Sequence, residues 1–361
     1  MTGRGTGRTM AGPGTWPARA RARFGDRGLA VALLLVLLAA AIVPLVALPA
    51  VRCEVFGAGC RAPLPGVQAH TAARDRDQPP TPAEAATRGA YVALGDSYSA
   101  GVGAEGGIAD ANPLSKCDRT SRAYYHTVAK TFRFAGGSSF WACSGATTGD
   151  IRGGRAGEPS QLNRLTAGTT LVTISVGGND IGFSKIMAGC VVKLPWSKGC
   201  EKQGGDIADR MAALRESLPR LITQITTRAP RARVIMMGYP RPFSEISANG
   251  GDNLTLSDQR WLNGRARDLN ELIRQAVSEA DQHVAATRGE GSVEFVDAYS
   301  AFSGHEAGSS DPYMNGLSVD LGALAAEPRS YHPTAKGQDA LARLFVDQIN
   351  KGPGRPLNQQ A

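Results

Sequence analysis

The chain has 361 residues, of which 42% are hydrophobic and 20% charged, with 44 glycines and 21 prolines. This composition excludes a disordered polyelectrolyte and a coiled coil, and the glycines lack the strict period of collagen. The formal net charge of +8 suggests a nucleic-acid or anionic-membrane partner only if the charge is spread over the folded part of the chain.

The positive charge is concentrated at the N-terminus. The first 52 residues hold seven arginines and the single acid Asp26, a net charge of +6, which leaves +2 for the other 309 residues. Residues 29–51 form the uncharged run LAVALLLVLLAAAIVPLVALPAV, which is long enough to cross a hydrocarbon core of about 30 Å. We therefore predict a basic cytoplasmic leader over 1–28 and a transmembrane signal anchor over 29–51. Leu48-Pro49-Ala50 is a weak cleavage site, so a cleaved signal peptide is the alternative. In both cases the rest of the chain is outside the cytoplasm, and we expect no nucleic-acid partner.

The composition of the segment after the apolar run predicts a flexible linker. Residues 61–88 are rich in proline, alanine and charge, so we predict a disordered linker over 52–88.

Six cysteines, an even number in an exported chain, predict three disulfides. Proximity in the sequence favours Cys53–Cys60 and Cys190–Cys200 and leaves Cys117–Cys143. The cysteines form no CxxC pair and the histidines no group typical of a zinc site, so we expect no metal or organic cofactor.

From residue 89 onward, strands and helices alternate. The sequence predicts an α/β domain over 89–351, followed by a flexible tail over 352–361. The expected strands are short apolar or β-branched runs: Ala90–Leu94, Ser138–Ala142, Leu171–Val176, Val234–Met237 and Val293–Val296. The expected helices are Ala123–Phe132, 205–228, a long helix capped by Ser257 and running to about 285, and Ala335–Ile349. Two strands apolar throughout indicate a five-stranded parallel sheet covered on both faces, whose ligands bind at the carboxyl ends of the strands.

The loop after the first strand, GDSYSAGVG, has two interpretations. Gly101 to Gly106 matches the GxGxxG spelling of a dinucleotide site. However, it lies seven residues beyond the strand and does not start a helix, so we reject it. The alternative places Ser97 at a tight turn from strand to helix, with its hydroxyl exposed at the sheet edge as a nucleophilic serine requires.

Three further motifs follow in order: CSGATT from Cys143, GGND from Gly177, and YHPTAKGQ from Tyr331. With GDSYSAG, they resemble the GDSL or SGNH hydrolases, and most closely the secreted actinomycete lipase and esterase branch. The resemblance covers residues 89 to about 350. It implies a three-layer, flavodoxin-like fold.

The resemblance also assigns the site. It implies Ser97 as the nucleophile and His332 as the general base, with an oxyanion hole formed by Ser97, Gly145 and Asn179. The three oxyanion residues all follow strand ends of one sheet, so their donors can converge on the oxygen of a tetrahedral intermediate. The expected reaction is hydrolysis of a carboxylic ester or lipid through an acyl-enzyme, by a monomeric domain attached to the membrane through the N-terminal helix. The alternative is a catalytically silent, surface-anchored protein that binds lipid or glycan.

One position departs from the family pattern. Much of the family has an aspartate three residues before the base, where this chain has Arg329. We therefore predict a Ser97/His332 dyad whose imidazole is oriented by the main-chain carbonyl of Arg329 or Ser330. Asp311 or Asp320 is the alternative orienting group.

Two other features remain open. His305 competes with His332 as the base, and we interpret it as structural or as part of the site lining. The apolar segment from Ser184 to Gly204 either lines an acyl-chain groove or covers the core.

Overall fold

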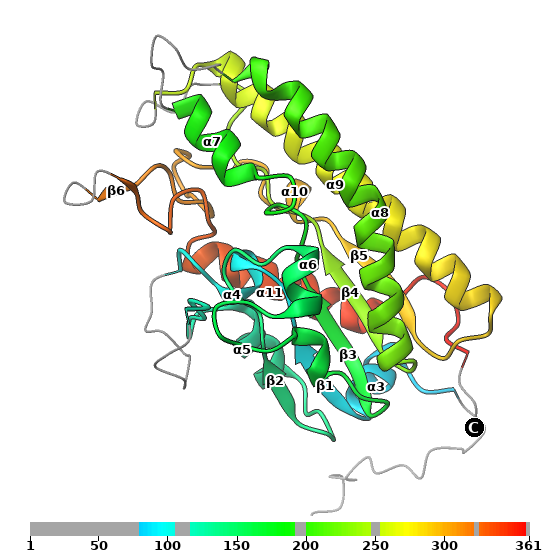
Figure 1. Ribbon diagram of the computed structural model, residues 1–361. Helices are drawn as coiled ribbons and strands as arrows, with labels where there is room; N and C mark the ends of the chain where they lie inside the picture. Colours follow the sequence, from blue (N-terminus) through cyan, green and yellow to red (C-terminus); the bar gives the residue numbers. More distant parts are fainter. Residues whose placement is uncertain (1–78, 105–115, 192–199, 247–252, 321–324, 359–361) are drawn as a thin grey trace, which may run out of the picture. The chain divides into compact units, whose positions relative to one another are not determined.

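The computed structural model describes residues 79–104, 116–191, 200–246, 253–320 and 325–358, which belong to one compact unit, Pro79–Ala361 (Figure 1). The predicted leader 1–28, the apolar run 29–51, most of the predicted linker and the Cys53–Cys60 pair lie outside these residues. In the described ranges, no helix combines the length and the apolar character needed to cross a membrane.

The centre of the unit is a five-stranded parallel sheet. Its strands are β1 (Ala90–Ala93), β2 (Ser138–Phe140), β3 (Thr169–Ile174), β4 (Arg233–Met237) and β5 (Ser292–Val296). They lie in the order β2-β1-β3-β4-β5, and every neighbouring pair is parallel. All residues of β3 and β4 are buried, and apart from Arg233 they are apolar or β-branched, as expected for strands covered on both faces. The predicted five-stranded parallel sheet is confirmed, and its order is that of a flavodoxin-like, doubly wound fold.

Helices cover both faces of the sheet (Figure 1). One face packs against α3 (Pro82–Thr87), α5 (Tyr124–Thr131) and α11 (Ala335–Lys351). The other carries α6 (Thr148–Gly153), the long pair α8 (Gly204–Arg228) and α9 (Leu256–Ala286), and the 3-10 turn η1 (Gln161–Arg164). The three layers enclose a core of apolar side chains.

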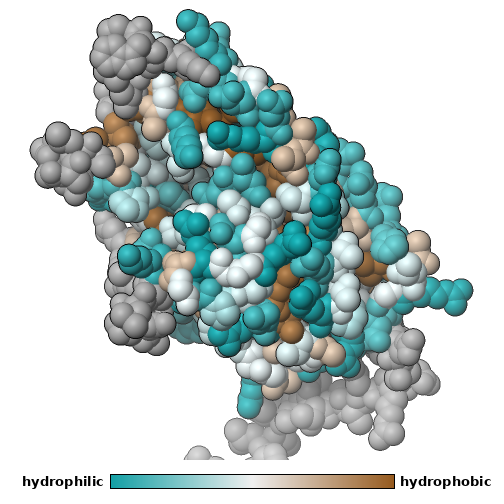
Figure 2. Space-filling view, in the orientation of Figure 1, coloured by the Kyte–Doolittle hydropathy of each residue, from teal (hydrophilic) through white to brown (hydrophobic). Residues whose placement is uncertain are grey.

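The smaller elements lie in the connections. They are α4 (Ser97–Ala100), α7 (Phe183–Val191), the 3-10 turn η2 (Glu201–Gln203), α10 (Ala298–Ala301), and the antiparallel pair β6 (Val319–Asp320) and β7 (Ala325–Ala326). Hydrophilic and neutral residues cover most of the face in Figure 2, and hydrophobic residues surface only in separate patches. One patch lies beside β6, where Val319 is 44% exposed.

The long helix α9 begins earlier than predicted. Its N-cap is Thr255 rather than Ser257, because Thr255 and Asp258 form a reciprocal capping box. The Thr255 hydroxyl accepts from the Asp258 amide at 3.2 Å, and the Asp258 carboxylate accepts from the Thr255 amide at 2.9 Å. The two residues together satisfy two amide donors, whereas a single serine cap satisfies one.

The folded unit extends beyond the predicted boundaries at both ends. The predicted linker includes helix α3, whose Ala85 and Ala86 are buried against the sheet layer. In the predicted tail, Arg355 donates two hydrogen bonds to Asp281, at 2.6 and 2.8 Å. The linker and tail predictions are therefore wrong over these residues, because contacts distant in sequence order segments whose composition alone resembles a tether.

Two of the three predicted disulfides lie in the described residues. Cys117 is bonded to Cys143, and Cys190 to Cys200. The first bond fixes the loop after β2 to the segment before α5, next to Gly145. Ser144 adds a hydrogen bond from its amide to the Cys117 carbonyl at 3.0 Å.

Candidate active site

Ser97 lies in a tight turn between β1 and the short helix α4. Asp96 is the N-cap of α4 and accepts from the Tyr98 amide at 3.0 Å. Gly95 has φ of +130°, and a Cβ there would lie 2.7 Å from the Ser175 carbonyl oxygen. The Gln161 side chain donates to the Gly95 carbonyl at 2.9 Å and accepts from its amide at 2.8 Å. The turn therefore requires glycine, and the Gln161 side chain binds both main-chain groups of Gly95. These contacts fix the Ser97 hydroxyl at the sheet edge.

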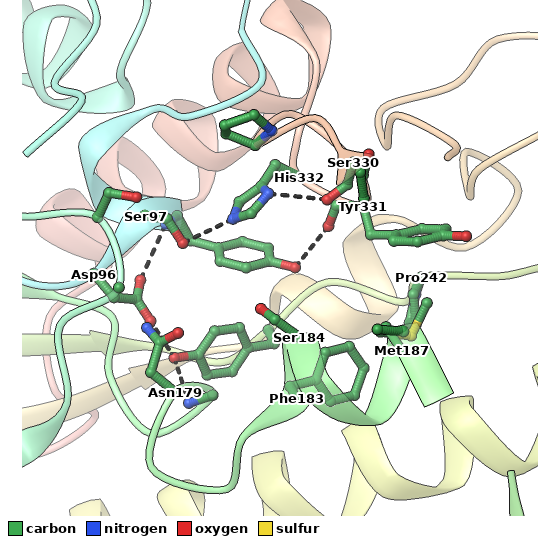
Figure 3. A pocket seen from close by; sticks show the side chains of 18 of the residues that line it. Asp96, Ser97, Asn179, Phe183, Ser184, Met187, Pro242, Ser330, Tyr331 and His332 are labelled. Atoms are coloured by element: carbon green, nitrogen blue, oxygen red, sulfur yellow. Dashed lines mark hydrogen bonds between the residues drawn. The ribbon is translucent and has the colours of Figure 1, made fainter. Parts of the chain in front are cut away.

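His332 faces this hydroxyl. Its Nε2 lies 2.8 Å from Ser97 Oγ, and its Nδ1 lies 3.1 Å from the Ser330 carbonyl oxygen (Figure 3). The Arg329 carbonyl accepts from the main-chain amide of His332 instead of from its ring. Burial lowers the pKa of His332 to about 4, although hydrogen bonds to the Ser330 and Pro328 carbonyls act in the opposite direction. The imidazole is therefore neutral at pH 7, with Nε2 available as an acceptor when Nδ1 carries the proton.

The alternative orienting groups do not join this pair. The Asp311 carboxylate pairs with Lys336 at 2.5 Å, and its main-chain carbonyl accepts from His305 Nδ1 at 2.8 Å. His305 stacks on Tyr313, with ring centroids 3.8 Å apart. The structure thus contradicts Asp311 as the orienting group and gives His305 a structural role. The structure does not describe the side chain of Asp320.

The two predicted oxyanion loops lie beside Ser97. Gly145 has φ of +76°, a backbone conformation that residues with a Cβ rarely adopt, and a Cβ there would also meet Arg155 Nη2 at 2.4 Å. The Asn179 carboxamide donates one hydrogen bond to the Ala146 carbonyl at 3.1 Å and has a second N–H to offer. Within the described ranges, the amides of Ser97 and Gly145 donate to no protein acceptor.

A cavity of about 510 Å³ connects these groups. Ser97, Gly145, Asn179 and His332 all line it, so the structure brings together the four residues that the motifs singled out. Figure 3 shows Ser97, His332 and Asn179 at one side and Phe183, Met187 and Pro242 at the other. Most of the remaining wall is apolar and comes from α7, α9, the loop after β4 and the β6–β7 hairpin. These residues are Phe183, Met187, Ala188, Val191, Pro240, Pro242, Ala266, Leu269, Leu317, Val319 and Ala326.

Helix α7, at the start of the apolar segment Ser184–Gly204, contributes both to the cavity and to the core. Ser184 and Val191 of α7 line the cavity, whereas Ile186 and Cys190 are buried in the core. Residues 192–199 lie outside the described ranges. One helix thus covers the core and forms a wall of the cavity.

The sequence pattern of the GDSL-like Lipase/Acylhydrolase family matches residues 93–340. The chain belongs to this family. A lipase from Streptomyces rimosus is similar to this GDSL-like hydrolase, with 35% identity over 255 residues, 69% of this chain and 82% of that protein.

Two crystal structures resemble this GDSL-like hydrolase. An extracellular lipase from Streptomyces rimosus, 31% identical, aligns with a TM-score of 0.58 over 72% of this chain and 99% of that one. Phospholipase A1 from Streptomyces albidoflavus, 32% identical, gives a TM-score of 0.57 over 73% and 99%. The predicted family and its actinomycete lipase branch are confirmed, and the protein is a carboxylic ester hydrolase.

Two further residues of this GDSL-like hydrolase, Asp96 and Tyr239, belong to the site and were not predicted from the sequence. Both line the cavity, and the Tyr239 hydroxyl donates to the Asp96 carboxylate. Burial raises the pKa of Asp96 to about 6, although hydrogen bonds from Ser175 and Tyr239 oppose this. Tyr239 directly follows Gly238 at the carboxyl end of β4, so the rule that ligands bind at strand ends was the one signal for it.

Proposed function

We propose that the protein is an extracytoplasmic serine esterase that hydrolyses lipid or other apolar carboxylic esters through an acyl-enzyme on Ser97. The observation that carries the proposal is the 2.8 Å contact between Ser97 Oγ and His332 Nε2 at the polar side of an otherwise largely apolar cavity. A silent binding protein needs no serine hydrogen-bonded to a neutral imidazole, so this contact favours turnover.

In the first half-reaction, Ser97 Oγ attacks the ester carbonyl carbon and gives its proton to His332 Nε2. The carbonyl oxygen becomes an oxyanion, which accepts hydrogen bonds from the Ser97 and Gly145 amides and from the free N–H of Asn179. The imidazolium then donates its proton to the leaving alcohol, the carbon–oxygen bond breaks, and an acyl group remains on Ser97.

In the second half-reaction, water takes the place of the alcohol. His332 accepts a proton from the water as it attacks the acyl-enzyme, and returns that proton to Ser97 Oγ as the carboxylic acid leaves. The Ser330 carbonyl accepts the Nδ1–H throughout and holds the required tautomer. A neutral carbonyl stabilises the imidazolium less than a carboxylate does, which makes this dyad more dependent on its oxyanion donors.

The expected substrate has an apolar acyl or alcohol part. The wall of α7, the loop after β4 and the β6–β7 hairpin offers contacts for an aliphatic chain, and burial of each CH₂ contributes about 0.8 kcal/mol. Two similar proteins are named a lipase and a phospholipase A1, which supports a lipid ester.

The expected location is outside the cytoplasm. Two disulfides, a basic leader followed by an uncharged 29–51 run, and a similar lipase described as extracellular support it. N-terminal sequencing of the mature protein distinguishes the two predicted fates of the leader: an intact N-terminus supports a signal anchor, and a start after Ala50 supports cleavage.

A fluorophosphonate probe tests the activity. We expect stoichiometric labelling of Ser97, no labelling of a folded Ser97→Ala variant, and rates on p-nitrophenyl esters that rise with acyl chain length beyond acetyl. A folded wild-type protein that neither reacts with the probe nor hydrolyses esters contradicts the proposed function.

A further inference from the structure

Tyr239 joins the two loops that carry the nucleophile and the candidate oxyanion donor. Its ring is buried, with 6% of the residue exposed, and none of the four sequence motifs includes it. Its hydroxyl donates to Asp96, the residue before Ser97, and accepts from the amide of Gly178, the residue before Asn179, at 2.8 Å. One hydroxyl group therefore connects the Ser97 turn to the Asn179 loop.

Tyr239 is itself held rigidly. The Asn270 side chain of α9 accepts from the Tyr239 amide at 2.7 Å and donates to the Tyr239 carbonyl at 2.8 Å. The edge of the ring contacts Tyr98, with centroids 5.0 Å apart and planes at 86°. A Cβ on Gly178 would lie 3.0 Å from the Tyr239 ring, so glycine at this position allows the loop to approach.

The direction of the hydrogen bonds is fixed by the charge of Asp96. Asp96 accepts from the Ser175 hydroxyl at 2.6 Å and from the Tyr98 amide at 3.0 Å, in addition to Tyr239. Burial raises the pKa of Tyr239, so the phenol stays protonated and its one proton points at the carboxylate. The remaining lone pairs of the phenol oxygen receive the Gly178 N–H. The chain of donors runs in one direction, from the Asn179 loop to the Ser97 turn.

We propose that Tyr239 is a positioning residue that sets the Asn179 carboxamide at the correct distance from Ser97 for oxyanion stabilisation; this rests on the function proposed above. A displacement of about 1 Å in a catalytic geometry costs roughly 10²-fold in rate, and loss of one oxyanion donor costs roughly 10²- to 10³-fold. Loss of the Tyr239 hydroxyl leaves Gly178 and Asp96 each without one partner, and the Asn179 loop is then free to move away from Ser97.

The test compares Tyr239→Phe with Tyr124→Phe. Tyr124 is the matched control, because its buried hydroxyl also contacts two partners, Ser99 at 3.0 Å and Thr173 at 3.2 Å, but it does not line the cavity. For Tyr239→Phe we expect kcat to fall about 10- to 100-fold with KM changed less than threefold. The control is expected to keep kcat within threefold of the wild type (~0.7 kcal/mol at most), even where its melting temperature falls.

A second readout separates positioning from simple loss of stability. A trifluoromethyl ketone forms a tetrahedral adduct with the serine, whereas a fatty acid product binds without one. We expect the inhibition constant of the ketone to rise by the same factor as kcat/KM falls, and that of the fatty acid to stay unchanged. Gly178→Ala, whose Cβ would lie 3.0 Å from the Tyr239 ring, is expected to give the same pattern. It replaces Tyr239→Phe if that variant does not fold.

The inference is overturned if Tyr239→Phe keeps kcat within threefold of the wild type, or if it loses kcat without losing affinity for the ketone. Equal losses in Tyr239→Phe and Tyr124→Phe also overturn it. Failure of the proposed function is a separate result, since it shows in the wild type as absence of ester hydrolysis and of fluorophosphonate labelling.

Discussion

The acid limb of the pH–rate profile follows from the surroundings of His332. Catalysis requires a neutral imidazole, and burial lowers the pKa of His332 to about 4. The pH dependence of kcat/KM reports the free enzyme. At pH 5, about 90% of a base with a pKa of about 4 is neutral, against about 3% of a histidine with the ordinary pKa of about 6.5. We therefore expect the acid limb that His332 contributes to kcat/KM on a soluble ester, with product measured by chromatography, to leave most of the rate at pH 5 and to be half complete near pH 4.

Asp96 titrates close to this range, because burial raises its pKa to about 6. Its protonation weakens the acceptor of the Tyr239 hydroxyl, so we expect a smaller step near pH 6 that is absent in Asp96→Asn. The limb near pH 4 persists in that variant if it belongs to His332. An acid limb centred near pH 6.5 in Asp96→Asn contradicts this expectation, because it shows an imidazole whose pKa burial does not lower.

Two variants of Arg329 form a matched pair that tests the same acid limb of the pH–rate profile. Arg329→Asp restores the carboxylate that much of the family has three residues before the base, and a nearby negative charge favours the imidazolium. We expect this variant to move the acid limb to higher pH, and Arg329→Gln to leave it in place. Identical limbs in both variants contradict the role of the orienting group in setting the pKa of His332.

Three further outcomes are expected. Gly145→Ala, with φ of +76° and a Cβ 2.4 Å from a guanidinium nitrogen, should lower kcat about 100-fold with little change in KM; wild-type kcat would contradict the oxyanion assignment. Glu294→Gln breaks an ion pair with Arg233 in which both side chains are at most 2% exposed, and should destabilise the fold by about 3 to 5 kcal/mol in urea unfolding. Glu216→Gln, in a pair that is 65% and 74% exposed, should cost about 0 to 1 kcal/mol, and equal losses would refute the argument. Met187→Trp should reduce kcat/KM for a dodecanoyl ester at least tenfold and spare the acetyl ester, and a uniform loss would exclude α7 as an acyl-chain wall.

Much of the fold could be predicted from local sequence. Strand β3 and residues Val234–Met237 of β4 are apolar or β-branched, and this pattern alone indicates a covered parallel sheet. Helix α3 was not predicted, although Thr81 and Glu84 form a capping box and Pro82 starts the helix. Its six residues are few for a helix, and distant contacts help to order them. Arg233 of β4 donates to the Pro82 carbonyl at 2.8 Å, and this contact spans 151 residues.

The residues of the site also divide into those that the sequence predicts and those that only the fold brings together. Ser97, Gly145, Asn179 and His332 could be found because each lies in a short motif, and three of them follow strands of one sheet. The choice between the Arg329 and Ser330 carbonyls depends on main-chain geometry, which the sequence does not specify. The Tyr239 contact with Asp96 spans 143 residues and has no motif. Side chains that position a site from a distance are therefore visible only in the fold.

Rapid-quench mass spectrometry during hydrolysis of a slow ester tests the central claim most directly. We expect an acyl group on the peptide that contains Ser97, formed and lost at rates that match turnover, and absent in Ser97→Ala. Ester hydrolysis by the wild type with acyl on another residue, or at an unchanged rate in Ser97→Ala, would contradict it.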